Sequence, residues 1–286
     1  MSSVAKRKKA EDASIPSPLV SKHWVTLPNG KLYRYVAAGN PDRPALVLLH
    51  GYTDSWRTFE PIIPLLQPHF HLIALDQRGH GDTGAEFATF EVEDFAVDAI
   101  SFVAQLTNLP VHLLGHSLGS LIAQRVAAAQ PELIDRLVLI GATDTAAGNP
   151  AIAGLQEELA SLTDPVPASF AHDFQSSTVQ QPFDEAQLAI FVAESQRVPL
   201  KVWRAVARSL VTDKRVVTPE IAAETLILWG DRDAVFDGAQ QQRLLGRLRN
   251  VRHLTYHGIG HAPHWEKPET VAQDIIDFLA TGREQE

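Results

Sequence analysis

Along most of this chain, short apolar runs alternate with segments in which apolar residues recur every three to four positions. Several runs have no polar face, which is typical of strands buried on both sides of a sheet. We expect such strands at residues 45–49, 71–75, 111–114, 137–140, 225–229 and 252–256. We expect helices at residues 56–66, 89–106, 120–129 and 237–248, and a last one from Pro268. Two more strands, residues 23–27 and 31–37, flank Pro28-Asn29-Gly30, a hairpin signal.

This alternation of strands and helices predicts an α/β fold, with a mostly parallel sheet and helices on both of its faces. The alternation stops between residues 145 and 218, where amphipathic helical patterns follow one another without strands. One of these helices carries apolar residues from Trp203 to Val211 on a single face. We therefore expect a core formed by residues 22–144 and 219–286, a helical cap formed by residues 145–218, and a disordered tail at residues 1–21.

Composition narrows the function classes. The chain has 286 residues, a net charge of −9 and no cysteine, so thiolate metal sites and cysteine nucleophiles are excluded. The negative charge argues against a nucleic acid or an anionic membrane surface as partner. The basic cluster Lys6–Lys9 has no apolar segment behind it, so we expect a cytoplasmic protein with a solvated tail rather than a secreted one. A nuclear-import or membrane-surface role of that cluster stays open, as does the oligomeric state.

The most informative motif is Gly115-His116-Ser117-Leu118-Gly119, between an expected strand and an expected helix. A serine flanked by glycines two residues away on each side, in that position, is typical of a nucleophile elbow. The turn is so sharp that side chains at the flanking positions would collide, so glycine fits there. The motif predicts an exposed Ser117 hydroxyl near the positive end of a helix.

Active sites in parallel α/β sheets lie beyond the carboxyl ends of the strands. A serine nucleophile needs a base, an acid that orients the base, and donors for the oxyanion. Three of the loops in that position carry suitable groups. Their sequences are His50-Gly51-Tyr52-Thr53-Asp54, Gly230-Asp231-Arg232-Asp233 and His257-Gly258-Ile259-Gly260-His261.

With these motifs and Asp76-Gln77-Arg78-Gly79-His80-Gly81 in order, the chain resembles the α/β-hydrolase superfamily from about Lys22 onward. It looks most like the cap-bearing bacterial esterases, peroxidase-like hydrolases and carbon–carbon hydrolases. The resemblance implies that Ser117 is the nucleophile, His261 the general base and Asp233 the acid that orients it. It also implies that the backbone N–H groups of Tyr52 and Leu118 form the oxyanion hole.

Several neighbouring residues compete for these roles or have simpler explanations. Asp231 and Asp144 are alternative candidates for the acid. Two histidines near His261 do not match the motif and are interpreted as loop and wall residues. Four other polar residues on these loops are usually structural in such folds, although Arg78 and His80 could also contact substrate. These six residues are His257, His264, His50, His116, Arg78 and His80.

The resemblance implies acyl transfer to water, with a small-molecule ester or lactone as substrate and no cofactor or metal. Serine at the elbow argues against epoxide hydrolase and haloalkane dehalogenase chemistry, which in this fold needs an aspartate there. Carbon–carbon bond hydrolysis, cofactor-free perhydrolysis and a triad-retaining small-molecule receptor remain alternatives. The expected pocket is apolar and roofed by the cap, with Phe170, Phe191, Trp203 and Trp265 as candidate wall residues. Trp203 fits a wall position and a position inside the cap equally well.

Overall fold

A computed structural model of the chain describes residues 20–106 and 109–280, and most of the expected tail, residues 1–19, lies outside these ranges. Within them the strands form one eight-stranded sheet in the order β1-β2-β4-β3-β5-β6-β7-β8. The strands are β1 (Ser21–Thr26), β2 (Leu32–Ala38), β3 (Ala45–Leu49), β4 (His71–Leu75), β5 (Val111–His116), β6 (Ile134–Ile140), β7 (Glu224–Gly230) and β8 (Val251–Tyr256). The hairpin β1–β2 is antiparallel and β2 pairs antiparallel with β4, whereas the remaining pairs are parallel. The predicted α/β architecture is therefore confirmed.

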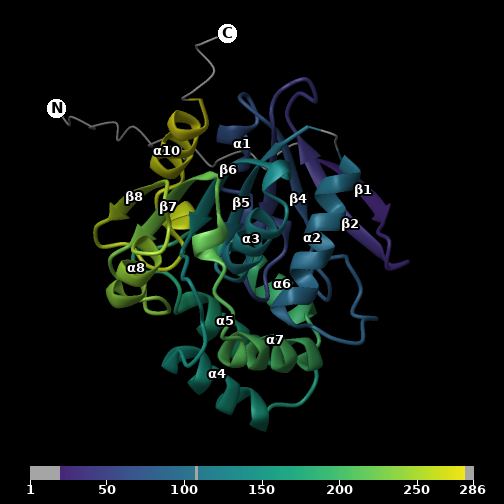
Figure 1. Cartoon of the computed structure of the whole chain (residues 1–286). Helices are drawn as coiled ribbons and strands as arrows, with labels where there is room; N and C mark the ends of the chain where they lie inside the picture. The colour runs from purple at the N-terminus through teal and green to yellow at the C-terminus, as the bar shows by residue number, and fades with distance from the viewer. Residues whose placement is uncertain (1–19, 107–108, 281–286) are drawn as a thin grey trace, which may run out of the picture.

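Helices cover both faces of the sheet (Figure 1). They are α1 (Ile63–Leu66), α2 (Val92–Leu106), α3 (Leu118–Ala129), α4 (Pro150–Ser161), α5 (Ala168–Ser176), α6 (Glu185–Arg197), α7 (Leu200–Thr212), α8 (Gly238–Leu245), α9 (Pro263–Glu266) and α10 (Pro268–Ala280). Short 3₁₀ turns occur at Trp56–Phe59, Pro131–Leu133 and Thr218–Glu220. In the described part of the chain, no helix combines the length and the apolarity needed to cross a membrane.

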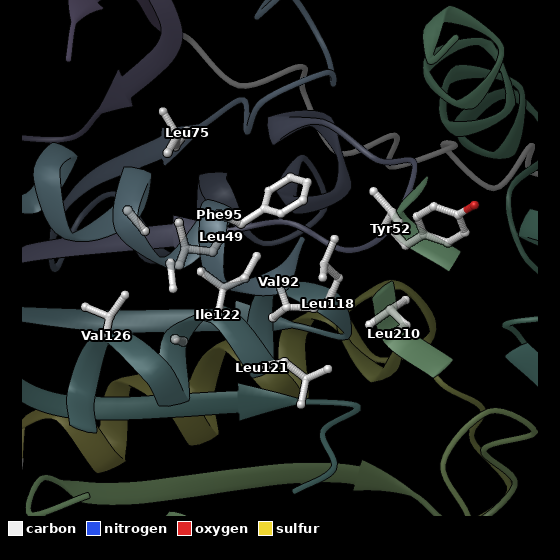
Figure 2. Packing of buried hydrophobic residues seen from close by; sticks show 14 of the residues in the cluster. Leu49, Tyr52, Leu75, Val92, Phe95, Leu118, Leu121, Ile122, Val126 and Leu210 are labelled. Atoms are coloured by element: carbon white, nitrogen blue, oxygen red, sulfur yellow. The ribbon is translucent and has the colours of Figure 1, made fainter. Parts of the chain in front are cut away.

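The buried strands explain why the molecule has two large hydrophobic cores. Side chains alternate between the faces of a strand, so Val47 and Leu49 of β3 enter one core and Leu46 and Leu48 enter the other. Helices α2 and α3 cover the first core, and α10 with the 3₁₀ turn Trp56–Phe59 covers the second. Figure 2 shows part of the first core, where side chains of β3, α2 and α3 meet.

The helix expected at residues 56–66 is wrong. The structure has a 3₁₀ turn at Trp56–Phe59 and the four-residue helix α1 instead. Pro61 and Pro64 explain the break, since proline lacks the backbone N–H that a continuous helix needs and clashes with the preceding turn.

Helices α4 to α7 lie between β6 and β7, and we refer to them with their connections, residues 145–218, as the insertion. Helices α4, α5 and α7 lie together at the bottom of the view, at one end of the sheet (Figure 1). The amphipathic helix expected around Trp203 is α7, and its apolar face, including Val206 and Leu210, is buried. These residues belong to the same hydrophobic core as Leu121 of α3. Figure 2 shows Leu210 near Leu121 and Tyr52, at the edge of that core.

Candidate active site

Ser117 occupies a sharp turn between β5 and α3. Its backbone has a φ of 52°, a left-handed conformation that is uncommon for any residue with a side chain. A β-carbon at Gly115 would lie 2.2 Å from the Gly119 carbonyl oxygen, and one at Gly119 would lie 2.0 Å from the Leu49 carbonyl oxygen. Glycine is therefore required at both positions, and the turn that they permit holds Ser117 at the carboxyl end of β5, where it lines a cavity.

His261 and Asp233 lie on the loops after β8 and β7 and form a buried pair. The Nδ1 of His261 is 2.8 Å from the Oδ2 of Asp233, whose side chain is fully buried. The Oδ1 of Asp233 accepts hydrogen bonds from the backbone N–H groups of Val235 and Phe236, at 2.7 and 2.9 Å. These donors stabilise the carboxylate and fix its orientation. His261 consequently donates from Nδ1, and its Nε2 carries the lone pair.

The Nε2 of His261 is buried and has no hydrogen-bond partner among residues 20–106 and 109–280. His261 lines the same cavity as Ser117. The backbone N–H of His261 donates to the Thr178 carbonyl at 2.8 Å, which ties the histidine loop to the insertion. The arrangement supplies what a general base for Ser117 needs, namely a free ring nitrogen and a carboxylate that orients the ring.

The two competing acids lie elsewhere. Asp231 accepts hydrogen bonds from the exposed His257, at 2.9 Å, and from the backbone N–H of Gly258, at 2.7 Å. The Oδ2 of Asp144 lies 2.6 Å from an Nη of Arg247. Each is thus engaged with a group other than His261, which favours Asp233 as the orienting acid.

The predicted oxyanion donors belong to the two loops that flank the cavity. Leu118 is the first residue of α3, so its N–H has no acceptor within the helix and points toward the helix N-terminus. Tyr52 follows β3, which pairs with β5 with Leu49 opposite Gly115. This pairing sets the Tyr52 loop beside the Ser117 turn, and Tyr52, Leu118 and Ser117 all line the cavity.

The cavity has a volume of about 370 Å³ and lies between the sheet and the insertion. Two of the four candidate wall residues, Phe170 and Trp265, line it, while Trp203 and Phe191 do not. This corrects the sequence-based expectation for those two residues. Both lie one layer behind the wall, since the Trp203 ring packs 5.1 Å from that of Phe174 and the Phe191 ring stacks 4.3 Å from that of Trp265.

Two further wall residues received no role from the sequence. Asp54 lies two positions after Tyr52, on a loop that the motif already singled out, so its spacing was a usable signal. Gln175 comes from α5 of the insertion, and nothing in the local pattern distinguishes it from other polar helix residues. Both side chains are buried and line the cavity.

Two other loop histidines, His50 and His80, are buried, and burial disfavours their charged forms. His50 donates from Nδ1 to the Gly51 carbonyl and accepts from the Gln77 N–H, and burial lowers its pKa to about 3. Burial also lowers the pKa of His80 to about 4, and its Nδ1 donates to the carbonyl of Arg78. The Nε and Nη2 of Arg78 donate to the Oδ2 and Oδ1 of Asp98, at 2.6 and 2.8 Å. His50, His80 and Arg78 thus tie neighbouring loops together, and none of them lines the cavity.

The two histidines nearest to His261 differ in their exposure to the cavity. His116 lies on the cavity wall with its ring 5.2 Å from that of His261, and burial lowers its pKa. His264 of α9 is fully buried behind the wall, and burial also lowers its pKa. At both positions burial therefore disfavours the charged form of the ring.

Comparison with known proteins adds independent evidence. Residues 44–268 match the family model of the alpha/beta hydrolase fold. The chain is 35% identical over 122 residues to (E)-2-((N-methylformamido)methylene)succinate hydrolase of Acinetobacter baylyi, a match that covers 43% of this chain and only 45% of that protein. It is 24% identical over 282 residues to Epoxide hydrolase 4 of Homo sapiens, which covers 88% of this chain and 76% of that protein.

A solved structure agrees with this assignment. A membrane phospholipase A, described as a bacterial virulence factor, superimposes with a TM-score of 0.78 at 26% identity. The superposition covers 91% of this chain and 86% of that one. The family model spans most of the chain, including the loops that carry Ser117, Asp233 and His261. The chain therefore belongs to the alpha/beta hydrolase family, and it is a hydrolase.

Proposed function

We propose that the protein hydrolyses a small or medium, uncharged carboxylic ester or lactone through an acyl-enzyme on Ser117. The observation that carries this proposal is the His261 ring. Its Nδ1 is hydrogen-bonded to the buried Asp233, while its Nε2, which has no hydrogen-bond partner among the described residues, is buried in the wall of the cavity that Ser117 also lines. Because residue 117 is a serine and not an aspartate or glutamate, attack of its Oγ on an ester carbonyl gives an acyl-enzyme as the intermediate.

In this mechanism His261 takes the Ser117 proton through Nε2 as Oγ attacks the carbonyl carbon. The tetrahedral oxyanion is stabilised by the N–H groups of Leu118 and Tyr52, which need no reorganisation as the charge develops. His261 then gives its proton to the leaving alcohol, and the acyl-enzyme forms. Water, deprotonated by His261, attacks the acyl carbon and releases the acid, so that Ser117 regains its proton.

The insertion acts as the cap that recognises the rest of the substrate. Helices α4 and α5 supply apolar wall residues, among them Ile152, Leu155, Phe170 and Phe174. The volume of about 370 Å³ lies at the low end of the range of small-molecule sites, which favours short or medium acyl and alcohol groups.

The charge of the cavity narrows the substrate class. Within the described part of the chain, its acidic wall residues are Asp54, Glu158 and Asp173, and no lysine or arginine lines it. A carboxylate on the substrate would therefore have no counter-ion at the wall and would face like charges. This favours uncharged esters over the half-esters of dicarboxylic acids.

We expect the purified protein to hydrolyse methyl pentanoate with a kcat/KM at least roughly tenfold above that for monomethyl succinate, which replaces the end of the acyl chain by a carboxylate. Initial rates by pH-stat titration measure both values, and the Ser117→Ala variant controls for contaminating esterases. Equal rates, or a preference for the half-ester, would contradict an uncharged substrate. No turnover of either ester, together with no labelling of Ser117 by an organophosphate, would reject the proposed function.

Truncation of cap residues should separate the wall from the layer behind it. Phe170→Ala enlarges the cavity directly, so we expect a shift in preference from nitrophenyl acetate toward nitrophenyl octanoate with little loss of melting temperature. Trp203→Ala leaves a hole in a fully buried core, so we expect a loss of about 3–5 kcal/mol in stability and lower activity on every ester alike. An unchanged chain-length profile in Phe170→Ala would show that α5 does not select the acyl group.

A further inference from the structure

Three consecutive residues of the loop after β3 are each hydrogen-bonded to a different helix of the insertion. The hydroxyl of Tyr52 donates to the Trp203 carbonyl of α7 at 2.6 Å. The Oγ1 of Thr53 lies 3.0 Å from the Oγ of Ser195 in α6. The Oδ1 of Asp54 accepts from the Nε2 of Gln175 in α5 at 3.0 Å. The loop that carries the proposed oxyanion donor is therefore held from the side of the insertion.

Gln175 and Ser195 join these contacts into one network. The Nε2 of Gln175 also donates to the Oγ of Ser195 at 2.7 Å, so Thr53, Ser195, Gln175 and Asp54 are linked in a chain. All four side chains are buried, with exposed fractions of 4% or less. Hydrogen bonds in such surroundings are strong, and groups that lose them are not rescued by bulk water.

Thr53 needs this support because its backbone is strained. Its φ of 67° lies in the left-handed region, where a β-branched residue is a genuine outlier. Such a conformation persists only where the surrounding structure imposes it. The hydroxyl of Thr53 is hydrogen-bonded to Ser195, and relaxation of Thr53 would move the adjoining Tyr52.

Gln175 has a second effect through Asp54. The carboxylate of Asp54 lines the cavity two residues from Tyr52, and Gln175 holds its Oδ1. A released carboxylate oxygen could turn toward nearby N–H donors and compete with the oxyanion for them. Holding Asp54 in place keeps the donor at Tyr52 available to the substrate.

We propose that Ser195 and Gln175 are positioning residues that hold the Tyr52 loop in the geometry of the oxyanion hole. This inference rests on the proposed function, since it assigns a role to the Tyr52 N–H in ester hydrolysis. The two residues act through the loop: Ser195 is not among the residues that line the cavity, and Gln175 acts through Asp54. The insertion thus contributes to the rate of the chemical step and not only to the choice of substrate.

The test compares Ser195→Ala with Ser209→Ala. Ser209 is a matched control, because it is also a buried serine of the insertion, in α7. Its Oγ accepts a hydrogen bond from the backbone N–H of Val92 in α2, at 3.0 Å, and not from the Tyr52 loop. We expect similar losses of melting temperature in both variants. Only Ser195→Ala should lower kcat for nitrophenyl butyrate, by roughly tenfold, which is less than the 10²–10³ that complete loss of an oxyanion donor costs.

The KM of Ser195→Ala should stay within about twofold of the wild-type value, because the oxyanion forms only after binding. Its affinity for a trifluoromethyl ketone, which forms an oxyanion adduct on serine, should fall by the same factor as kcat. A second pair of variants, at Thr53, avoids reliance on Ser195→Ala alone. Thr53→Val removes the hydroxyl and should reproduce the loss of kcat, whereas Thr53→Ser keeps the hydroxyl and should have a kcat close to that of the wild-type protein.

The possible failures are distinguishable. If the wild-type protein hydrolyses the ester and Ser195→Ala matches Ser209→Ala in kcat and in ketone affinity, the positioning role is wrong and the proposed function stands. The same conclusion follows if Thr53→Val and Thr53→Ser have equal kcat values. If the wild-type protein hydrolyses no ester and binds no trifluoromethyl ketone, the proposed function itself fails, and the positioning role fails with it.

Discussion

Replacement of Ser117 by alanine is expected to lower kcat for a nitrophenyl ester by roughly 10⁴- to 10⁶-fold, the scale found when a serine nucleophile is removed. The variant should remain folded, because alanine keeps the β-carbon that the turn already accommodates and the glycines at 115 and 119 are untouched. Steady-state kinetics and the melting temperature measure the two effects. An organophosphate should label wild-type Ser117 covalently, as seen by peptide mass spectrometry.

Ser120→Ala is the control for this experiment. Ser120 is fully buried and donates to the Ser117 carbonyl at 2.6 Å, so its loss disturbs the same turn without removing the nucleophile. We expect less than a tenfold change in kcat for Ser120→Ala. Full activity in Ser117→Ala, or labelling of Ser120 in the wild-type protein, would refute Ser117 as the nucleophile.

The second large effect is expected from Asp233→Asn. The Oδ1 of Asp233 is held by two backbone N–H groups, so an asparagine oxygen would occupy that position and its NH₂ group would face the Nδ1 of His261. His261 would then have to place its proton on Nε2 and could not accept the Ser117 proton. We expect kcat to fall by about 10⁴, as when the histidine of a serine protease is held in the wrong tautomer.

Asp144→Asn and Asp231→Asn are the matched controls, since each changes a carboxylate that pairs with a group other than His261. Both should retain kcat within about tenfold, and Asp144→Asn should mainly lower stability by weakening its contact with Arg247. Steady-state kinetics at pH 7 on the three variants decide between the acids. A mild Asp233→Asn combined with a severe Asp144→Asn would move the acid to the loop after β6.

The sheet and the Ser117 turn were predictable because their signals are local. Strands such as β3 are continuous apolar runs, and the geometry of the turn depends on two glycines that stand next to the serine in the sequence. The loops that carry Asp233 and His261 also followed from a rule of topology, since the carboxyl ends of parallel strands meet at one edge of the sheet, whereas the choice of these two residues came from the resemblance to a family. The interrupted helix at 56–66 shows where apolar periodicity fails when prolines are overlooked.

The cavity wall could be predicted only in part because it is a tertiary property. Phe170 and Trp203 are both aromatic residues of the insertion, yet only Phe170 reaches the cavity, and the difference depends on how α5 and α7 pack against each other. Gln175 becomes informative only when Asp54 and Ser195, distant in the sequence, are brought to it. No periodicity or motif carries information of that kind.

The hydrophobic core that continues from α3 into α7 also limits how this protein can evolve. Substrate-recognising segments that are merely tethered to a scaffold can be exchanged or lengthened with little effect on the rest. Here Val206 and Leu210 of α7 share a core with Leu121 of α3, so a change of volume in one helix must be matched in the other. New specificities are therefore reached more easily by changes at the cavity face of α4 and α5 than by replacement of the whole segment.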